Sequence, residues 1–346
     1  MDALRLNSET FPASQAEIEA FSAAGVSVSA VESVDSALSR SLLPSIDALL
    51  VVSSKVRREV IDRLDRCRVI VRYGSGTDNV DVERATERGI VVANVPDFCL
   101  SEVADHTMAL LLSTARKLIL MDRYTRTGRW HARVEERVRR IAGKTLGLVG
   151  FGSIAREVAR RAIAFDLKVI AYDPYLDRAR ARSLGVEEVG LEELLQEADF
   201  VSVHVPLTNQ TAHMIGEKQL RMMKPESLLI NTARGGVVDE AALVRALSEG
   251  WIAGAGIDVY ENLPMFDPEP AFTRHPFFDL ENVVLTPHSA GTSIEALDEL
   301  MLDGAREAIT VLSGRPPQNW VNPGVVPRSP LQAVEAARSD GTRDRG

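Results

Sequence analysis

The sequence predicts an α/β protein with a doubly wound parallel sheet and a second, smaller α/β domain. Three observations lead to this prediction. Short apolar strands alternate with helical segments through the middle of the chain, a glycine-rich turn follows one of these strands, and the N-terminal part repeats the alternation on a smaller scale. The length of 346 residues suits two domains of ordinary size.

The larger domain is predicted from six apolar segments, each followed by a turn and most by a helical stretch. Strands this apolar are typical of a parallel sheet that is covered by helices on both faces. Six such units favour a nucleotide-binding sheet of the Rossmann type. The predicted strands end at Gly150, Asp173, Val205, Ala233, Val259 and His288.

The smaller domain is predicted from the segments DALLVVSS, CRVIVRYG and GIVVANVP, which have the composition of short parallel strands. Residues Ala16–Ala24 and Val56–Leu64 are predicted helices of this domain. Longer helices are expected at Ser101–Lys117 and Ile294–Leu312. From about Arg328 to Gly346 the composition is polar and small, which predicts a disordered tail.

The composition limits the classes of partner. A formal net charge of −9 argues against nucleic acid, because phosphate binding needs a concentrated basic surface. No segment reaches the roughly 18 consecutive apolar residues of a membrane span, and the N-terminus shows no signal-peptide pattern. With only Cys67 and Cys99 available, a reducing compartment is favoured. We therefore expect a cytoplasmic protein that binds neither nucleic acid nor membrane.

The segment GLVGFGSIA matches the GxGxxG/A pattern of a dinucleotide-binding turn. Gly150 permits the tight turn, Gly152 lets a pyrophosphate approach the helix N-terminus, and Ala155 lets the helix pack closely. Asp173 lies at the end of the next strand, where a carboxylate binds ribose hydroxyls and repels a 2′-phosphate. The pattern predicts NAD rather than NADP. The alternative is a glycine-rich turn in an unrelated α/β protein.

Three polar residues follow three successive strands, at the edge where the crevice of an open parallel sheet lies. Arg234 is suited to hold a substrate carboxylate, and His288 to exchange a proton with the oxygen of the adjacent carbonyl. A carboxylate such as Asp258 beside the histidine raises its pKa and fixes its tautomer. Separately, each has a structural alternative: a helix cap or an interdomain ion pair for Arg234, a turn cap for Asp258 and a loop histidine for His288. His204, inside an apolar strand, is interpreted as a packed histidine, and no spacing predicts a metal site.

With these motifs in view, the chain resembles the D-isomer-specific 2-hydroxyacid dehydrogenase family from about Asp47 to Pro323. The segments that carry the resemblance are VRYGSGTDNVD, NVPDFCLSEVADHTMALLL, GKTLGLVGFGSIA, HVPLT, MKPESLLINTARGGVVDEAAL, GAGIDVYE and NVVLTPHSAG. The resemblance implies NAD as cofactor and hydride transfer at C2 of a small 2-hydroxy or 2-keto acid. It also implies a homodimer through the NAD domains, and a discontinuous substrate domain of residues 1–98 and 292–327 with a flavodoxin-like fold, around an NAD domain of residues 99–291.

The resemblance also assigns roles to residues. It implies Arg234 as the substrate-carboxylate anchor, His288 as the acid/base, and backbone around Gly74, Ser75 and Gly76 as further substrate contacts. The expected cofactor-binding residues are Gly150, Gly152, Ser153, Ile154, Asp173, Pro206, Thr232, Ala233, Arg234, Asp258, His288 and Gly291.

The sequence departs from the family pattern at three places. Ser153 stands where Arg is usual, which removes one possible pyrophosphate partner, and Ala155 replaces a glycine. The position of the family's catalytic Glu is Leu263. Either the acid is lost, or an insertion restores the motif at Asp267-Pro268-Glu269-Pro270 and makes Glu269 the partner of His288. Glu261 is the next candidate, and a surface role for Glu269 is the alternative.

The expected activity is reduction of a 2-keto acid by NADH, or the reverse reaction. A competing hypothesis is an NAD(H)-sensing interaction protein like the corepressor branch of the family, with weak or no turnover. Oxidation of formate or phosphite is disfavoured, because formate dehydrogenases carry Gln at the acid position and no Gln lies near it in this sequence.

Overall fold

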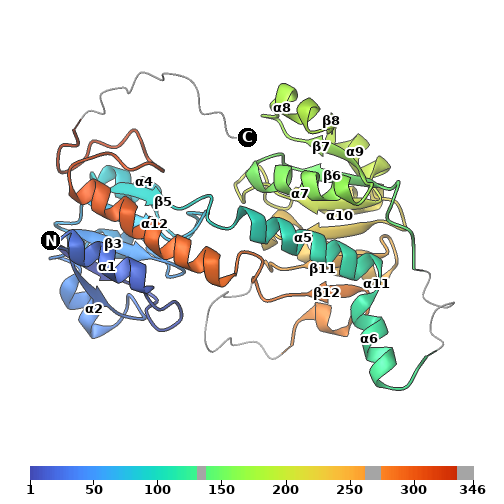
Figure 1. Cartoon of the computed structure of the whole chain (residues 1–346), viewed down its shortest axis with the longest axis horizontal. Helices are drawn as coiled ribbons and strands as arrows, with labels where there is room; N and C mark the ends of the chain where they lie inside the picture. The colour runs from blue at the N-terminus through green and yellow to red at the C-terminus, as the bar shows by residue number, and fades with distance from the viewer. Residues whose placement is uncertain (131–137, 262–273, 333–346) are drawn as a thin grey trace. The chain divides into compact units, whose positions relative to one another are not determined.

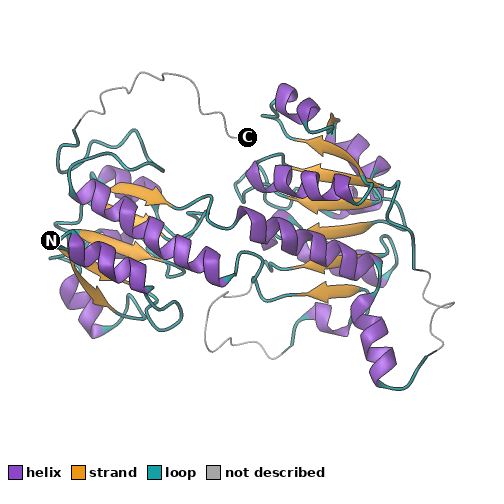
Figure 2. Cartoon of the chain, in the orientation of Figure 1, coloured by secondary structure: helices purple, strands orange, loops and turns teal. Residues whose placement is uncertain are grey.

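The computed structural model describes residues 1–130, 138–261 and 274–332. The chain forms two compact units: Met1–Phe98 together with Ile294–Gly346, and Cys99–Ser293. Each unit contains one parallel β-sheet with helices on both faces (Figures 1 and 2). The predicted fold class is confirmed.

The first unit is built on a five-stranded parallel sheet of order β2-β1-β3-β4-β5. Apolar side chains alternate between the two faces of each strand, so that neighbouring residues enter separate cores. One core lies under α1 and α12, and the other lies under α2, α3 and α4. The elements are β1 (Asp2–Arg5), α1 (Gln15–Ala23), β2 (Ser27–Ala30), α2 (Ala37–Leu42), β3 (Ala48–Val51), α3 (Arg58–Ile61), β4 (Val69–Arg72), α4 (Val82–Glu87), β5 (Val91–Asn94) and α12 (Ile294–Leu312).

The second unit is built on a seven-stranded parallel sheet of order β12-β11-β10-β9-β6-β7-β8. Chain order reverses beside β6, which creates the switch point where doubly wound sheets bind ligands. The elements are α5 (Leu100–Ala115), α6 (Leu118–Arg126), β6 (Thr145–Val149), α7 (Ser153–Ala164), β7 (Lys168–Tyr172), α8 (Arg178–Ser183), β8 (Glu187–Glu188), α9 (Leu191–Glu197), β9 (Phe200–Val203), α10 (Glu217–Met222), β10 (Leu228–Asn231), η1 (Gly235–Val237), α11 (Glu240–Ser248), β11 (Gly254–Ile257), η2 (Pro276–Asp279) and β12 (Val283–Leu285).

The faces of the larger sheet are covered by different helices. Helices α5 and α7 pack side by side on one face, where their small and apolar side chains meet Leu146, Leu148 and Ile230 (Figure 1). Helices α9, α10 and α11 cover the other face over Val201, Leu229 and neighbouring strand residues. Among helices of the described residues, none is both long enough and apolar enough to cross a bilayer.

Two sequence predictions need correction. The helix expected at Val56–Leu64 is only Arg58–Ile61, because Val56 pairs with Val80 in an isolated parallel bridge. The first residues of the tail expected from Arg328 to Gly346 are held by hydrogen bonds: the Arg328 side chain donates to the carbonyls of Arg88 and Asp65 at 2.6 and 2.9 Å, and the Gln332 N–H donates to Gly314 at 2.7 Å. Residues 333–346 lie outside the described residues.

Candidate active site

The turn between β6 and α7 has the geometry of a phosphate-binding loop. Gly150 has φ +94°, and a Cβ at this position would lie 2.9 Å from the backbone carbon of His204, so only glycine fits. A Cβ at Gly152 would meet open space, and this residue directly precedes the N-terminus of α7. The loop therefore leaves room for an anion beside the first turn of a twelve-residue helix.

Asp173 follows β7 and faces the same turn. Its Oδ2 accepts from the N–H of Phe151 at 2.8 Å, and its Oδ1 accepts from the N–H of Tyr175 at 2.8 Å. These two bonds fix the carboxylate beside the glycine turn, and each oxygen keeps a second acceptor position for a hydroxyl group. The expected ribose-binding acid thus lies where the dinucleotide motif requires it.

The residues after β9 and β10 line the same carboxyl edge of the sheet. The Thr232 hydroxyl is 2.8 Å from the hydroxyl of Thr107 on α5. The side-chain oxygen of Asn231 accepts from the N–H of Ala233 at 3.1 Å. The Pro206 carbonyl accepts from the Thr211 hydroxyl at 2.5 Å. These hydrogen bonds hold the segments of the expected cofactor residues in place in addition to apolar packing.

Arg234 lies immediately after this strand segment, at the start of the short helix η1. Its Nη1 donates to the carbonyl of Ala233 at 2.8 Å, and its carbonyl accepts from the Asn231 side chain at 3.0 Å. Position 235 requires a glycine, because the backbone of Tyr260 passes so closely that a Cβ at Gly235 would lie 2.0 Å from it. The Arg234 side chain is thereby held at the carboxyl edge of the sheet.

Asp258 and His288 are joined through one turn. The His288 N–H donates to the Asp258 carbonyl at 2.8 Å, and His288 has a left-handed φ of +56°. The Asp258 carboxylate is 0% exposed and accepts from the N–H groups of Ser289 and Ala290 at 2.9 and 3.0 Å. In these contacts Asp258 caps a turn, as the alternative interpretation expects. Asp258 also positions His288 through the same turn. Gly291 ends this turn against Cys99, whose sulfur would lie 3.1 Å from a Cβ there.

Two further residues complete this cluster and were not predicted. The Thr286 hydroxyl donates to Asp258 Oδ1 at 2.6 Å, and His106 Nε2 lies 2.9 Å from the same hydroxyl. Since the hydroxyl proton is used toward Asp258, the His106 Nε2 must carry a proton and donate it to Thr286. His106 belongs to α5, far away in sequence, and the motif DHT gave no sign of this contact.

Of the two acids considered as partners of His288, only Glu261 lies among the described residues. Glu269 and Leu263 lie outside the described residues. The carboxylate of Glu261 forms a hydrogen bond with His213 Nε2, which raises the pKa of that imidazole. The Glu261 N–H also donates to Glu240 at 3.0 Å, and Glu240 in turn contacts His275 Nε2 at 3.0 Å. Glu261 therefore belongs to a carboxylate–histidine cluster with histidines other than His288.

His204 is the packed histidine that the sequence suggested. Its Nε2 lies 2.9 Å from the Ser202 hydroxyl, and burial lowers its pKa to about 4. The imidazole is therefore neutral at physiological pH. Within the part of the chain that the structure describes, no group of three His, Cys, Asp or Glu side chains is arranged to hold a metal ion.

In the first unit, the expected substrate loop follows β4. The carbonyls of Gly74 and Ser75 accept from the Val95 N–H at 3.2 Å and the Asn94 side chain at 2.7 Å. Among the described residues, none of the N–H groups of Gly74, Ser75 and Gly76 donates to a protein acceptor. A loop whose carbonyls are bonded and whose N–H groups remain available is suited to bind an anion.

A buried polar cluster holds the start of this loop. The Tyr73 hydroxyl donates to Glu17 at 2.9 Å, and Arg5 Nε donates to the same carboxylate oxygen at 3.1 Å. All three side chains are at most 2% exposed. Burial, followed by the neighbouring Glu17 charge, raises the pKa of Tyr73 well above its ordinary value. Gly304 on α12 makes space for the ring, since a Cβ there would lie 2.3 Å from Tyr73 Cε1.

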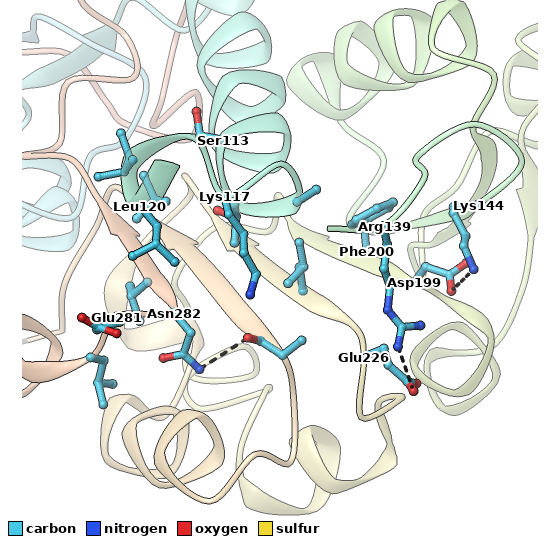
Figure 3. A pocket seen from close by; sticks show the side chains of 18 of the residues that line it. Ser113, Lys117, Leu120, Arg139, Lys144, Asp199, Phe200, Glu226, Glu281 and Asn282 are labelled. Atoms are coloured by element: carbon cyan, nitrogen blue, oxygen red, sulfur yellow. Dashed lines mark hydrogen bonds and ion pairs between the residues drawn. The ribbon is translucent and has the colours of Figure 1, made fainter. Parts of the chain in front are cut away.

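A pocket of the second unit lies away from this site. It has a volume of about 540 Å³ and lies at the opposite edge of the sheet, where β9 to β12 begin. Figure 3 shows Lys117 and Leu120 on one side, and Arg139 paired with Glu226 at 3.2 Å on another. None of the expected catalytic or cofactor residues lines it, so the pocket and the chemistry are separate features.

Comparison with known proteins agrees with this geometry. Residues 108–290 match the NAD-binding domain of D-isomer specific 2-hydroxyacid dehydrogenases. The chain is 42% identical over 295 residues to a glyoxylate reductase of Thermococcus litoralis, covering 82% of this chain and 86% of the relative. It is 44% identical over 284 residues to a glyoxylate reductase of Korarchaeum cryptofilum, covering 81% and 84%.

A solved structure of D-lactate dehydrogenase from Aquifex aeolicus, complexed with NAD and lactic acid, has the same fold. It superposes with a TM-score of 0.81 at 27% identity, covering 90% of this chain and 96% of that chain. The glycine turn, the open space at Gly152 and the fixed Asp173 carboxylate fit the NAD that the family uses. The predicted family and cofactor are confirmed, and the chain belongs to the D-isomer-specific 2-hydroxyacid dehydrogenases as an NAD-dependent oxidoreductase.

Proposed function

We propose that this dehydrogenase reduces a small 2-keto acid with NADH, and that glyoxylate is the leading candidate substrate. The observation that carries the proposal is the convergence of Arg234 and His288 on the carboxyl edge of one sheet, which also carries the Gly150–Gly152 turn. The choice of glyoxylate is supported by the names of the relatives, which are glyoxylate reductases at 42% and 44% identity.

In this proposal, Arg234 binds the substrate carboxylate through two parallel N–H donors, which orients the neighbouring carbonyl. When bound, NADH supplies the hydride that reaches C2. His288 donates a proton to the carbonyl oxygen as negative charge develops there, and takes it back in the reverse reaction. The Asp258 carboxylate positions the His288 backbone through the turn at Ser289 and Ala290. Thr286 and His106 hold that carboxylate in turn.

The proposal includes two further assignments. The available N–H groups of Gly74, Ser75 and Gly76 are assigned to substrate binding, because they form an anion-binding arrangement at the end of β4. Glu269 is assigned as the acid partner of His288. Only the sequence supports that role, through the Glu-Pro run that restores the family motif.

A homodimer through the NAD-binding unit is also part of the proposal. Helix α6 has no buried residue, and Leu118 and Ile119 on it are 51% and 55% exposed. Ile119 also lines the 540 Å³ pocket of Figure 3, so exposed apolar side chains of α6 adjoin a concave surface. A second copy of the chain is the proposed occupant, and Ile119→Asp is expected to yield monomers in sedimentation experiments. A cytoplasmic location is also part of the proposal. It is supported by the two cysteines, Cys67 and Cys99, which are buried thiols outside any disulfide.

The test is a panel of 2-keto acids (glyoxylate, pyruvate, hydroxypyruvate and oxaloacetate) with NADH absorbance as the readout. Turnover of glyoxylate with the highest kcat/KM is the expected result. Turnover of a different acid would keep the reaction class and replace the substrate. Tight NADH binding without turnover of any acid would contradict the proposal and favour the NAD(H)-sensing interaction protein.

A further inference from the structure

A buried ion pair lies in the core of the first unit, close to the substrate loop (residues 74–76). Arg5 is the last residue of β1, and Glu17 lies in the first turn of α1. Their side chains are 2% and 1% exposed, and Arg5 Nε donates to Glu17 Oε1 at 3.1 Å. The core under α1 and α12 is otherwise made largely of apolar side chains. Two charges in these surroundings need an explanation, since charged residues are seldom fully buried.

Stability of the core does not account for the pair. Removing two charges from water costs more than their attraction returns, unless their other polar atoms are also bonded. Within the described residues, Arg5 Nη1 and Glu17 Oε2 have no hydrogen-bond partner. Arg5 Nη2 donates to the Sδ of Met301 at 3.1 Å, and a thioether is a weak acceptor. Replacing such a pair with apolar residues of similar volume is often neutral or stabilising, so a role other than core stability is indicated.

The pair is connected to the substrate loop through Tyr73, which directly precedes Gly74. Glu17 Oε1 accepts from the Tyr73 hydroxyl at 2.9 Å. Burial and the Glu17 charge raise the pKa of Tyr73 well above its ordinary value, so the hydroxyl keeps its proton and remains a donor. The ring packs against α12 at Gly304, where a Cβ would lie 2.3 Å from Tyr73 Cε1. Packing therefore fixes the ring, and the hydrogen bond to Glu17 fixes its hydroxyl.

The backbone of Tyr73 is fixed as well. Its N–H donates to the Val51 carbonyl at 2.7 Å, which continues the parallel pairing of β3 with β4. Its carbonyl accepts from Arg72 Nη1 at 2.7 Å. The next residue, Gly74, has φ +132°, a conformation that glycine adopts readily. Because the side chain and both backbone groups of Tyr73 are held, Tyr73 sets the direction in which the chain enters the loop, and with it the direction of the loop N–H groups.

We propose that the Arg5–Glu17 ion pair positions the substrate loop, with the Tyr73 hydroxyl as the link between them. Arg5 holds Glu17, Glu17 fixes the Tyr73 ring, and Tyr73 directs the N–H groups of residues 74–76 toward the carboxylate of the keto acid. All three side chains are at most 2% exposed, so they act as positioning residues and do not contact the substrate. The inference rests on the proposed function, in which this loop binds the substrate carboxylate.

The experiment measures steady-state kinetics with glyoxylate and NADH, and the dissociation constants of NADH and of oxamate, an unreactive isostere of a keto acid, added to the enzyme with NADH. Tyr73→Phe removes the hydroxyl and keeps the ring. We expect the KM for glyoxylate and the dissociation constant of oxamate to rise by about tenfold, because a small misplacement of binding groups has a large effect. The value of kcat should stay within about twofold of wild type, since the loop binds the carboxylate equally in substrate and transition state. The dissociation constant of NADH should not change.

A second set of variants tests whether the three side chains act together. The variant with both Arg5→Met and Glu17→Met should keep the fold in urea unfolding, because apolar residues replace the whole pair. Its KM for glyoxylate should rise as in Tyr73→Phe. Adding Tyr73→Phe to this variant should raise the KM no further, since the hydroxyl has already lost its acceptor. A further tenfold rise in the triple variant would overturn the link through Tyr73.

The matched control is Ser39→Ala, which removes another fully buried hydroxyl of the same unit, one that donates to the Ser33 carbonyl at 2.6 Å. It should lower the free energy of unfolding and leave the KM and the oxamate dissociation constant unchanged. Wild-type values of both constants in Tyr73→Phe, or an equal rise in Ser39→Ala, would overturn the inference. If wild-type enzyme binds oxamate but reduces no keto acid, the proposed function fails while oxamate binding still decides the inference. If it binds no oxamate, both fail.

Discussion

His288 and Asp258 are linked twice through a single turn: the His288 N–H donates to the Asp258 carbonyl at 2.8 Å, and the Asp258 carboxylate accepts from the two residues that follow His288. A left-handed conformation is unfavourable for a histidine unless its surroundings impose it. The fully buried carboxylate of Asp258 supplies that constraint. Asp258 therefore acts on His288 through the backbone of this turn.

The first prediction concerns this carboxylate. Asp258→Asn replaces one acceptor oxygen by an NH₂ group, which must face a backbone N–H or the Thr286 hydroxyl. We expect a loss of about 1–3 kcal/mol in the free energy of unfolding, the cost of an unsatisfied buried group, and a fall in kcat of at least about tenfold. Denaturant titration and steady-state kinetics measure both. Thr286→Val removes one of the donors to the carboxylate, together with the acceptor of His106, and should have a smaller effect on kcat in the same direction. Wild-type kcat in Asp258→Asn would disprove the positioning role.

The second prediction concerns Arg234. Arg234→Lys keeps the charge but loses the planar two-bond grip on a carboxylate. We expect the KM for the keto acid to rise and kcat to fall, with kcat/KM lower by at least about tenfold, while the dissociation constant for NADH is largely kept. Arg245→Lys is the matched control, because Arg245 is 53% exposed on α11 and pairs with Glu217. If Arg234→Lys keeps the wild-type kcat/KM, Arg234 is not the anchor.

The third prediction concerns cofactor choice. The Asp173 carboxylate is fixed beside the phosphate turn by the N–H groups of Phe151 and Tyr175, where it repels a 2′-phosphate. We expect NADH to be preferred over NADPH by at least about tenfold in kcat/KM, equivalent to roughly 1.4 kcal/mol. Asp173→Ala should reduce this ratio, whereas Asp177→Ala, which removes the N-cap of α8, should not. Equal efficiency of the two cofactors in wild type would refute the assignment of Asp173.

Much of the fold and part of the site could be predicted from local sequence. The apolar strands of the larger sheet are buried on both faces, so their composition is distinctive without any knowledge of the tertiary structure. The glycine turn could be predicted because Gly150 needs a positive φ and a close backbone approach, two demands that only glycine meets. Arg234, Asp258 and His288 follow strands of one parallel sheet, so strand order alone placed them at one edge.

The remaining features depend on contacts between distant segments. His106 on α5 reaches Thr286 after β12, and no spacing rule connects a helix residue with a loop that is far along the chain. The short length of α3 was missed because Val56 pairs with Val80, so a tertiary bridge replaced the helical conformation that the local pattern favoured. The burial of Arg5 and Glu17 was also unpredictable, since charged residues are seldom buried without a partner and the partner became visible only in the folded unit.

The fourth prediction concerns the acid partner of His288. Glu269→Gln should lower kcat and shift the pH profile of keto-acid reduction to lower pH, because His288 would lose its proton earlier without a neighbouring carboxylate. Glu261→Gln should do little to this profile, since Glu261 contacts His213 and Glu240. His288→Asn should nearly abolish turnover and leave NADH binding intact.

Measuring kcat/KM against pH for these three variants separates the assignments. A shifted profile in Glu261→Gln together with an unshifted one in Glu269→Gln would place the acid at residue 261. Profiles without a shift in either variant would mean that His288 works without a carboxylate partner. That result would favour the alternative in which this chain has lost the family's catalytic Glu.

The last prediction concerns His204, whose pKa is lowered by burial to about 4. The unfolded chain binds a proton at this residue with an ordinary pKa of about 6.5. The stability that the neutral imidazole contributes is therefore complete above about pH 6.5 and is lost as the pH falls toward 4. At pH 5 the loss amounts to at most about 2 kcal/mol. Urea unfolding at pH 7.5 and 5.0 should show a larger drop in the free energy of unfolding for wild type than for His204→Gln. The raised pKa of His213 acts in the opposite direction in both proteins and cancels in this comparison. An equal drop in the two proteins would mean that His204 can take up a proton without cost to the fold.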